Sequence, residues 1–166
     1  MTDFSIQPAT PNDCGLILDF IKGIAEYEKL SHLVEATEEK IQTHLFGEKA
    51  VAACIIAYNN KEAVGFALYF HNYSTFVSKP GIYLEDLFVL PIHRGKGYGK
   101  KLLLHLVQTA YEKNCGRLEW SVLDWNKPAI EFYESLGAKP MQGWTVYRMD
   151  EGRIKELAQA NLSQNN

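Results

Sequence analysis

Two adjacent carboxylates interrupt an apolar stretch of the chain, and a group of alternating glycines follows them. Glu85 and Asp86 lie within "GIYLEDLFVL", and glycines 95, 97 and 99 lie within "HRGKGYGKK". A carboxylate can accept a proton or hold a cation. Glycines let backbone N–H groups approach a ligand closely. The arrangement therefore indicates acid–base chemistry and ligand binding in one short stretch.

The glycines stand between a strand that ends at Pro91 and a helix, whose N-terminus carries partial positive charge. Arg94 and Lys100 add full charges, so a pyrophosphate is the expected guest. The stretch is not a Walker A loop, because Lys101 rather than Ser or Thr follows Lys100. It is also not a dinucleotide fingerprint, because the glycines read GxGxG. A turn that only caps the helix stays open as the alternative.

Hydrophobic periodicity along the rest of the chain predicts an α/β protein with one domain, residues 1–166. Expected strands fall within 3–9, 51–58, 63–73, 81–90, 117–124 and 144–150, and expected helices within 10–29, 35–47, 99–114 and 126–137. Thr10, Thr37 and Asn126 are candidate N-caps, and Gly47 and Gly137 are helix stops. The tail 161–166 is expected to fray.

Composition excludes several classes of function. The 17 Lys and Arg against 20 Asp and Glu give a net charge of −3, which argues against nucleic-acid binding. Three widely spaced cysteines without a CxxC pair indicate reduced thiols. No apolar run is long enough to cross a membrane, and the first residues show no signal peptide, so we expect a cytoplasmic protein. The five histidines lack metal-ligand spacing, so we expect no metal site.

The motif "RGKGYGKKLL" resembles the (Q/R)xxGxG/A pyrophosphate loop of the GNAT superfamily of acetyl-CoA-dependent N-acetyltransferases. The segments "YLEDLFV", "DWNKPAIEFYESLGA", "IQPATPNDC", "IKGIAEYE" and the late "GW" resemble its diamine (spermidine/spermine) and thialysine acetyltransferase branch. This resemblance covers nearly the whole chain. It implies the GNAT fold, a mixed, mostly antiparallel twisted sheet of about six or seven strands with helices on both faces. It also implies acetyl-CoA as co-substrate and a homodimer.

The resemblance assigns the reaction to two side chains. Acetyl transfer requires a free amine, and an alkylamine has a pKa of about 10. Glu85 matches the catalytic glutamate that takes this proton, directly or through water, and Tyr133 matches the general acid that protonates the departing thiolate. The implied cofactor-binding residues are Leu87, Phe88, Val89, Arg94, Gly95, Lys96, Gly97, Tyr98, Gly99, Lys100 and Asn126, with the backbone of Leu87 and Val89 pairing with the pantetheine arm.

The amine site is less defined by the sequence. Tyr27, Glu28, Glu119 and Trp120, together with Glu85, match substrate-binding positions of the branch, although a solvated helix-end charge is an equal alternative for Glu28. Strand alternation sends Glu85 and Asp86 to opposite faces unless a bulge alters the register, and the role of Asp86 stays open.

One position departs from the branch. Gln142 stands where polyamine enzymes carry an acid before "GW", which favours a short amine or an amino-acid side chain, such as thialysine, over a long polyamine.

These observations predict an N-acetyltransferase that acts on a small primary amine by direct transfer in a ternary complex. Two alternatives remain open. One is a GNAT enzyme that acetylates protein N-termini or lysines. The other is a non-catalytic module that senses acyl-CoA, which would need the glycine loop but neither Glu85 nor Tyr133.

Overall fold

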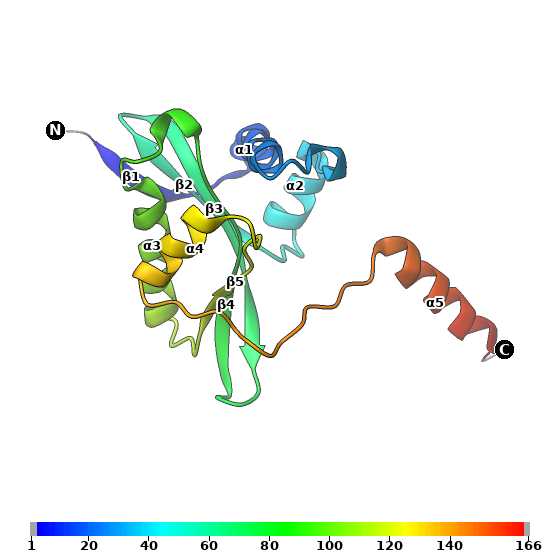
Figure 1. The fold of residues 1–166 in the computed structure, drawn as a ribbon. Coiled ribbons are helices and arrows are strands. Elements are labelled where there is room, and N and C mark those ends of the chain that lie inside the picture. The colour runs from blue at the N-terminus through cyan, green and yellow to red at the C-terminus, as the bar shows by residue number, and fades with distance from the viewer. Residues whose placement is uncertain (1–2, 165–166) are drawn as a thin grey trace. The chain divides into compact units, whose positions relative to one another are not determined.

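The computed structural model describes residues 3–164 and contains one five-stranded sheet, shown in Figure 1. The strands run in the order β1-β2-β3-β4-β5, with bounds Phe4–Pro8, Ala53–Asn59, Glu62–Ser74, Lys79–Val89 and Leu118–Trp120. The first four pair antiparallel, and β5 pairs with β4 in parallel. The sheet is mixed and mostly antiparallel, as expected from the sequence.

Helices cover both faces of the sheet. Helices α1 (Cys14–Tyr27) and α2 (Glu38–Phe46) lie on one face, and α3 (Tyr98–Glu112) lies on the other (Figure 1). Adjacent residues at the end of β4 show the two faces directly. The Phe88 ring approaches Gly23 of α1, whereas the Val89 side chain approaches Gly99 of α3.

The core between α1, α2 and the sheet is built from aromatic and aliphatic side chains. The Phe20 ring stacks on Phe66 with 5.2 Å between centroids and meets Phe88 edge-on at 6.3 Å. Buried neighbours complete the cluster: Cys14, Ile17, Ile41, Cys54 and Ile56. Each buried aromatic ring contributes a large apolar area, so this cluster fixes α1 against β3 and β4.

Local signals in the sequence account for the helix ends. Asp13 accepts hydrogen bonds from the Thr10 backbone N–H and hydroxyl at 2.7 and 2.8 Å, ahead of α1. The Thr37 hydroxyl accepts from the Lys40 N–H at the start of α2. Gly47 follows the last residue of α2, so both ends of this helix are as predicted.

Strand β4 contains a bulge at the two carboxylates. Asp86 pairs with Leu68 and Leu84 pairs with Tyr69, which leaves Glu85 as an additional residue without a partner in β3. A bulge inserts one residue and re-aims the side chains around it. The simple alternation expected for Glu85 and Asp86 is therefore interrupted at this position.

The chain divides into two compact units between Ser121 and Val122. The second unit holds α4 (Lys127–Ser135) and α5 (Glu151–Gln164). The Asn126 side chain caps α4 by accepting from the Ala129 N–H, as predicted.

The last predicted strand is wrong. Residues 144–150 form no regular structure, and the strand total is five rather than six or seven. A strand needs a neighbour to pair its N–H and C=O groups, and within residues 3–164 this segment has none. The tail was also expected to fray, but α5 reaches Gln164; Asn165 and Asn166 lie outside the described residues. Among the described helices, none has both the length and the apolar character that a membrane span requires.

Replacing Gly23 with alanine is expected to destabilise the fold. A Cβ at this position would lie 2.8 Å from the ring of Phe88, which is itself buried. Overpacking of this kind costs about 1–3 kcal/mol, more than the gain of up to about 1 kcal/mol in helix propensity. Urea denaturation should therefore show a lower midpoint for Gly23→Ala.

Gly15→Ala is the matched control in the same helix. Its added Cβ would meet only the Glu38 carboxyl group, at an ordinary 3.6 Å. This variant should be as stable as wild type or more stable. A Gly23→Ala midpoint at or above that of wild type would show that Phe88 does not limit the approach of α1.

Candidate active site

The glycine loop is open to a ligand. Gly95 and Gly97 have φ angles of +75° and +79°, in the left-handed region that favours glycine. A Cβ placed on either would meet no heavy atom within 4 Å, so the space above the loop is unfilled by the protein. Helix α3 begins at Tyr98, directly after Gly97. The loop therefore presents bare backbone at a helix N-terminus, which suits a pyrophosphate.

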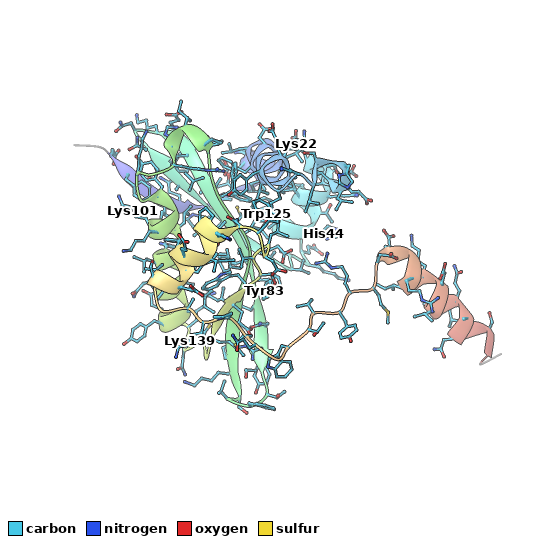
Figure 2. The ribbon with its side chains drawn as sticks, viewed as in Figure 1. Lys22, His44, Tyr83, Lys101, Trp125 and Lys139 are labelled. Atoms are coloured by element: carbon cyan, nitrogen blue, oxygen red, sulfur yellow. The ribbon has the colours of Figure 1, made fainter. Side chains whose placement is uncertain are left out.

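Two contacts fix the loop at its ends. Before it, the buried His93 ring lies 3.2 Å from a Glu62 carboxylate oxygen through Nε2. After it, the buried Tyr98 ring stacks on Phe4 of β1 with 5.1 Å between centroids. The Lys101 ammonium, labelled in Figure 2, lies 4.1 Å from the Phe4 ring centroid.

Cations surround the loop without filling it. Arg94, Lys96 and Lys100 are exposed, so their charges are accessible from solvent. Arginine and lysine side chains form the strongest hydrogen bonds that proteins offer to phosphate oxygens. With the helix N-terminus, they form a positive rim around the bare backbone. The residues present thus fit the pyrophosphate of a nucleotide cofactor.

Strand β4 also exposes backbone beside the loop. It pairs with β5 only through Ile82, Tyr83 and Leu84, although it continues to Val89. Among the described strands, none pairs with residues 85–89 on the β5 side, so an extended ligand arm can add there. Leu87 and Val89 are half-buried at this edge, whereas the Phe88 side chain points into the core.

A pocket lies on the α1 side of β4 and contains three carboxylates. Glu28, Glu35 and Asp86 share it with apolar residues from α1 and the chain that follows: Ile21, Ile24, Ala25, Leu30, Leu33, Val34 and Ala36. An apolar pocket with a few convergent polar groups is the usual form of a small-molecule site. The negative groups favour a cationic guest.

Burial changes the acidity of two of these groups. Burial, followed by the nearby charges of Glu85 and Glu28, raises the pKa of Asp86 to about 6. Burial also raises the pKa of Glu28. Neither carboxylate forms a salt bridge within residues 3–164, and an ammonium group would supply the compensating charge. Glu85, in contrast, is exposed at the bulge.

The sequence left the role of Asp86 open, with a substrate-side role possible, and did not identify the apolar wall of this pocket. Asp86 carries no signal beyond its place beside Glu85. The segment "LSHLVEA", which supplies several wall residues, contains no motif. Only the packing of α1 against β4 brings these residues together.

Tyr27 and Glu119 have other contacts in the structure. The Tyr27 ring lies under the Arg94 guanidinium, with 4.6 Å from Cζ to the ring centroid, and Tyr27 is not one of the residues that line the pocket. The Glu119 carboxylate pairs with Arg117 at 2.7 Å and accepts from the Asn72 amide at 2.9 Å. Trp120, next to it on β5, is half-buried. The pocket thus brings together Glu28 and Asp86 but not Tyr27, Glu119 or Trp120.

The remaining predicted residues belong to the second unit. Asn126 and Tyr133 are both half-buried on or beside α4. The Tyr133 ring packs against Phe132 with 5.3 Å between centroids. Asn126 caps α4 and Tyr133 lies on it, so both side chains are positioned by this one helix.

Two further kinds of chemistry, attack by a cysteine thiol and metal binding, can be compared with the structure. Burial raises the pKa of Cys54 to about 12, so its thiol is a poor nucleophile. Within residues 3–164, His, Cys, Asp and Glu side chains do not gather in threes as metal ligands do.

Comparison with known proteins identifies related sequences and folds. Residues 21–138 match the Acetyltransferase (GNAT) family. The thialysine N-epsilon-acetyltransferase of Bos taurus is 38% identical over 164 residues, covering 92% of this chain and 96% of the relative. The L-ornithine N5-acetyltransferase of Arabidopsis thaliana is 29% identical over 202 residues, covering 95% and 89%. An integron cassette protein of V. cholerae superposes with a TM-score of 0.78 at 28% identity, covering 94% of this chain and 98% of that one.

Replacing Asp86 with asparagine is expected to stabilise the unliganded protein at neutral pH. The ordinary pKa is 3.8 and that of the folded state is about 6, so the folded state binds more protons between these values. The free energy of unfolding therefore falls as the pH rises through this window. Asp86→Asn should be more stable than wild type by about 1–3 kcal/mol at pH 8, and the difference should vanish below about pH 4.

Glu85→Gln is the control, because Glu85 is exposed on the same strand. Its unfolding free energy should keep most of the wild-type fall between pH 4 and 6, because burial is the largest cause of the raised pKa of Asp86 and the charge of Glu85 adds less. Denaturant titrations at several pH values measure both variants. A wild-type stability that does not fall across this window would contradict the burial of an unpaired Asp86.

Proposed function

Because this chain belongs to the GNAT family and is an N-acetyltransferase, we propose that it transfers acetyl from acetyl-CoA to a primary amine of a small molecule, by direct transfer in a ternary complex. The observation that carries the proposal is the position of the acidic pocket. Asp86 and Glu28 lie on the α1 side of β4, and the same strand leads into the glycine loop. Residues that suit a cation and residues that suit a phosphate therefore lie close to the same strand.

The unit that contains β4 fits acetyl-CoA. The bare backbone of Gly95 and Gly97 and the rim of Arg94, Lys96 and Lys100 suit its pyrophosphate. The unpaired edge of residues 85–89 suits its extended pantetheine arm. When bound, acetyl-CoA supplies an acetyl group activated as a thioester. Asn126 of the second unit is a further proposed contact, which rests on the resemblance alone.

Three acids have different roles toward the amine in this proposal. Asp86 and Glu28 hold the ammonium group, which in turn stabilises their ionised forms. Glu85, exposed at the bulge, accepts the proton that the ammonium must lose, through water. The freed nitrogen lone pair then forms a bond to the acetyl carbon, and the nitrogen releases its second proton to solvent as it becomes an amide. Tyr133 of the second unit, whose role rests on the resemblance alone, donates a proton to the thiolate that leaves as the carbon–sulfur bond breaks, and regains one from solvent.

The size and charge of the pocket favour an amine at the end of a short aliphatic chain. The apolar wall from α1 suits methylene groups, and the carboxylates suit one terminal ammonium. Thialysine and ornithine, named in two of the relatives, are amino acids with such a side chain. The absence of an acid at Gln142 supports this class over long polyamines. We therefore propose an amino-acid side-chain amine as the substrate. The cytoplasmic location and the homodimer stay predictions.

Acetyl transfer should be strongest for short side-chain amines. In steady-state assays with acetyl-CoA, we expect thialysine, ornithine or lysine to give a kcat/KM at least about tenfold above spermidine, because Gln142 replaces the acid that polyamine enzymes carry for a distant second ammonium. Activity on a histone-like peptide above that on all free amines would favour the alternative of a protein acetyltransferase. Binding of CoA without transfer to any amine would favour the acyl-CoA sensor.

Substitution of the two proposed proton-transfer groups should give different kinetic results. Glu85→Gln should lower kcat by about 10²-fold or more and move the pH–rate profile toward alkaline pH, because the amine must then lose its proton to solvent. Tyr133→Phe should lower kcat with little change in the dissociation constant of CoA. An unaltered pH profile for Glu85→Gln would remove Glu85 as the base.

A further inference from the structure

The side chain of Arg94 is held by three groups beneath the glycine loop. Its Nε donates to the Val89 carbonyl at 3.0 Å. Its guanidinium carbon lies 4.6 Å from the centroid of the Tyr27 ring and 5.5 Å from that of Phe88. These partners come from two different elements: Tyr27 is the last residue of α1, and Phe88 and Val89 end β4. Arg94 thus connects the start of the glycine loop with the C-terminal end of α1, the helix that forms part of the pocket wall.

This arrangement leaves the phosphate-binding part of Arg94 available. Nε makes the one side-chain hydrogen bond that Arg94 has among the described residues, so the two terminal nitrogens keep their N–H donors. These donors match two oxygens of a phosphate. An arginine that is already held in place loses less side-chain entropy when it binds.

The end of α1 also favours the cation electrostatically. A helix C-terminus carries partial negative charge, and α1 ends at Tyr27. The face of the Tyr27 ring adds the attraction of an aromatic quadrupole for a cation. Glu28 follows Tyr27 directly, but its carboxylate lines the amine pocket and Tyr27 does not. These two consecutive residues therefore have different neighbours, the pocket for Glu28 and Arg94 for Tyr27.

We propose that Tyr27 is a positioning residue for acetyl-CoA, because its ring holds Arg94 with its terminal N–H groups directed to the pyrophosphate. The proposal rests on the cofactor site of the proposed function. It differs from the resemblance, which places Tyr27 in the amine site. A residue of the amine-side helix thereby contributes to the affinity for the cofactor.

Calorimetric titration of CoA without amine tests this assignment. Tyr27→Leu removes the ring and should raise the dissociation constant of CoA about 3–10-fold, the range expected for a partly exposed cation–π contact. Tyr27→Phe keeps the ring and should stay within about twofold of wild type. Tyr27→Met replaces Tyr27→Leu if the latter unfolds, and thermal melts of each variant verify that it is folded.

A double-mutant cycle tests whether Tyr27 acts through Arg94. In an Arg94→Gln background, Tyr27→Leu should weaken CoA binding by less than about twofold further, because the cation that it holds is gone. Equal effects of Tyr27→Leu in the two backgrounds would overturn the proposed route. Steady-state kinetics should show a raised KM for acetyl-CoA, with the KM of the amine unchanged.

The outcomes separate this inference from the proposed function. A wild-type protein that binds no CoA would overturn both. A Tyr27→Leu variant that binds CoA as wild type does, but has a raised KM for the amine, would overturn the inference alone and return Tyr27 to the amine site. CoA binding that depends on Tyr27 without any acetyl transfer would support the inference and overturn the proposed function.

Discussion

The pairing of β4 is the constraint on which the site depends. The strand is held along its length by β3 but by β5 over only three residues. Beyond Leu84, no strand within residues 3–164 pairs with it on the β5 side, while its side chains still pack against α1 and α3. A fully paired β4 would leave no place for an extended ligand, and an unpaired one would not keep the loop in position. Partial pairing keeps the edge accessible and the strand ordered.

The acidic pocket shows how stability and binding oppose each other. An unpaired carboxylate in a half-buried, apolar position destabilises the free protein, and the raised pKa of Asp86 expresses this cost. The same cost favours any guest that carries a positive charge. Asp86 has no arginine or lysine beside it in the pocket. Under the proposed function, the ammonium group of the substrate compensates its charge.

Much of the fold could be predicted because short-range signals determine it. Thr37 and Gly47 set the ends of α2, and Asn60 and Lys61, both with positive φ, form the turn between β2 and β3. The strand 144–150 was predicted from its pattern alone, but a strand also depends on a partner that no local pattern supplies. The strand predicted within 117–124 is shortened to β5, Leu118–Trp120, for the same reason, because only these three residues pair with β4.

The site was predictable where a motif exists and not where packing decides. The glycine loop could be placed from spacing, since positive φ and bare backbone require glycine at 95 and 97. The bulge at Glu85 could not, because two adjacent acids do not reveal which residue is the additional one. The contact of Tyr27 with Arg94 joins residues that are 67 positions apart. Only the tertiary structure brings them together.

The bulge has a consequence for how such a site can evolve. Loss of the single residue Glu85 would restore a regular ladder between β3 and β4. Leu84 already lies opposite Tyr69 and Asp86 opposite Leu68, so both residues would keep their partners and their faces. The residues on either side of the bulge would therefore stay in their present cores. Point substitutions can tune the acids of this strand one at a time, whereas a deletion of one codon would remove Glu85 and the bulge in the same step and leave the strand in register.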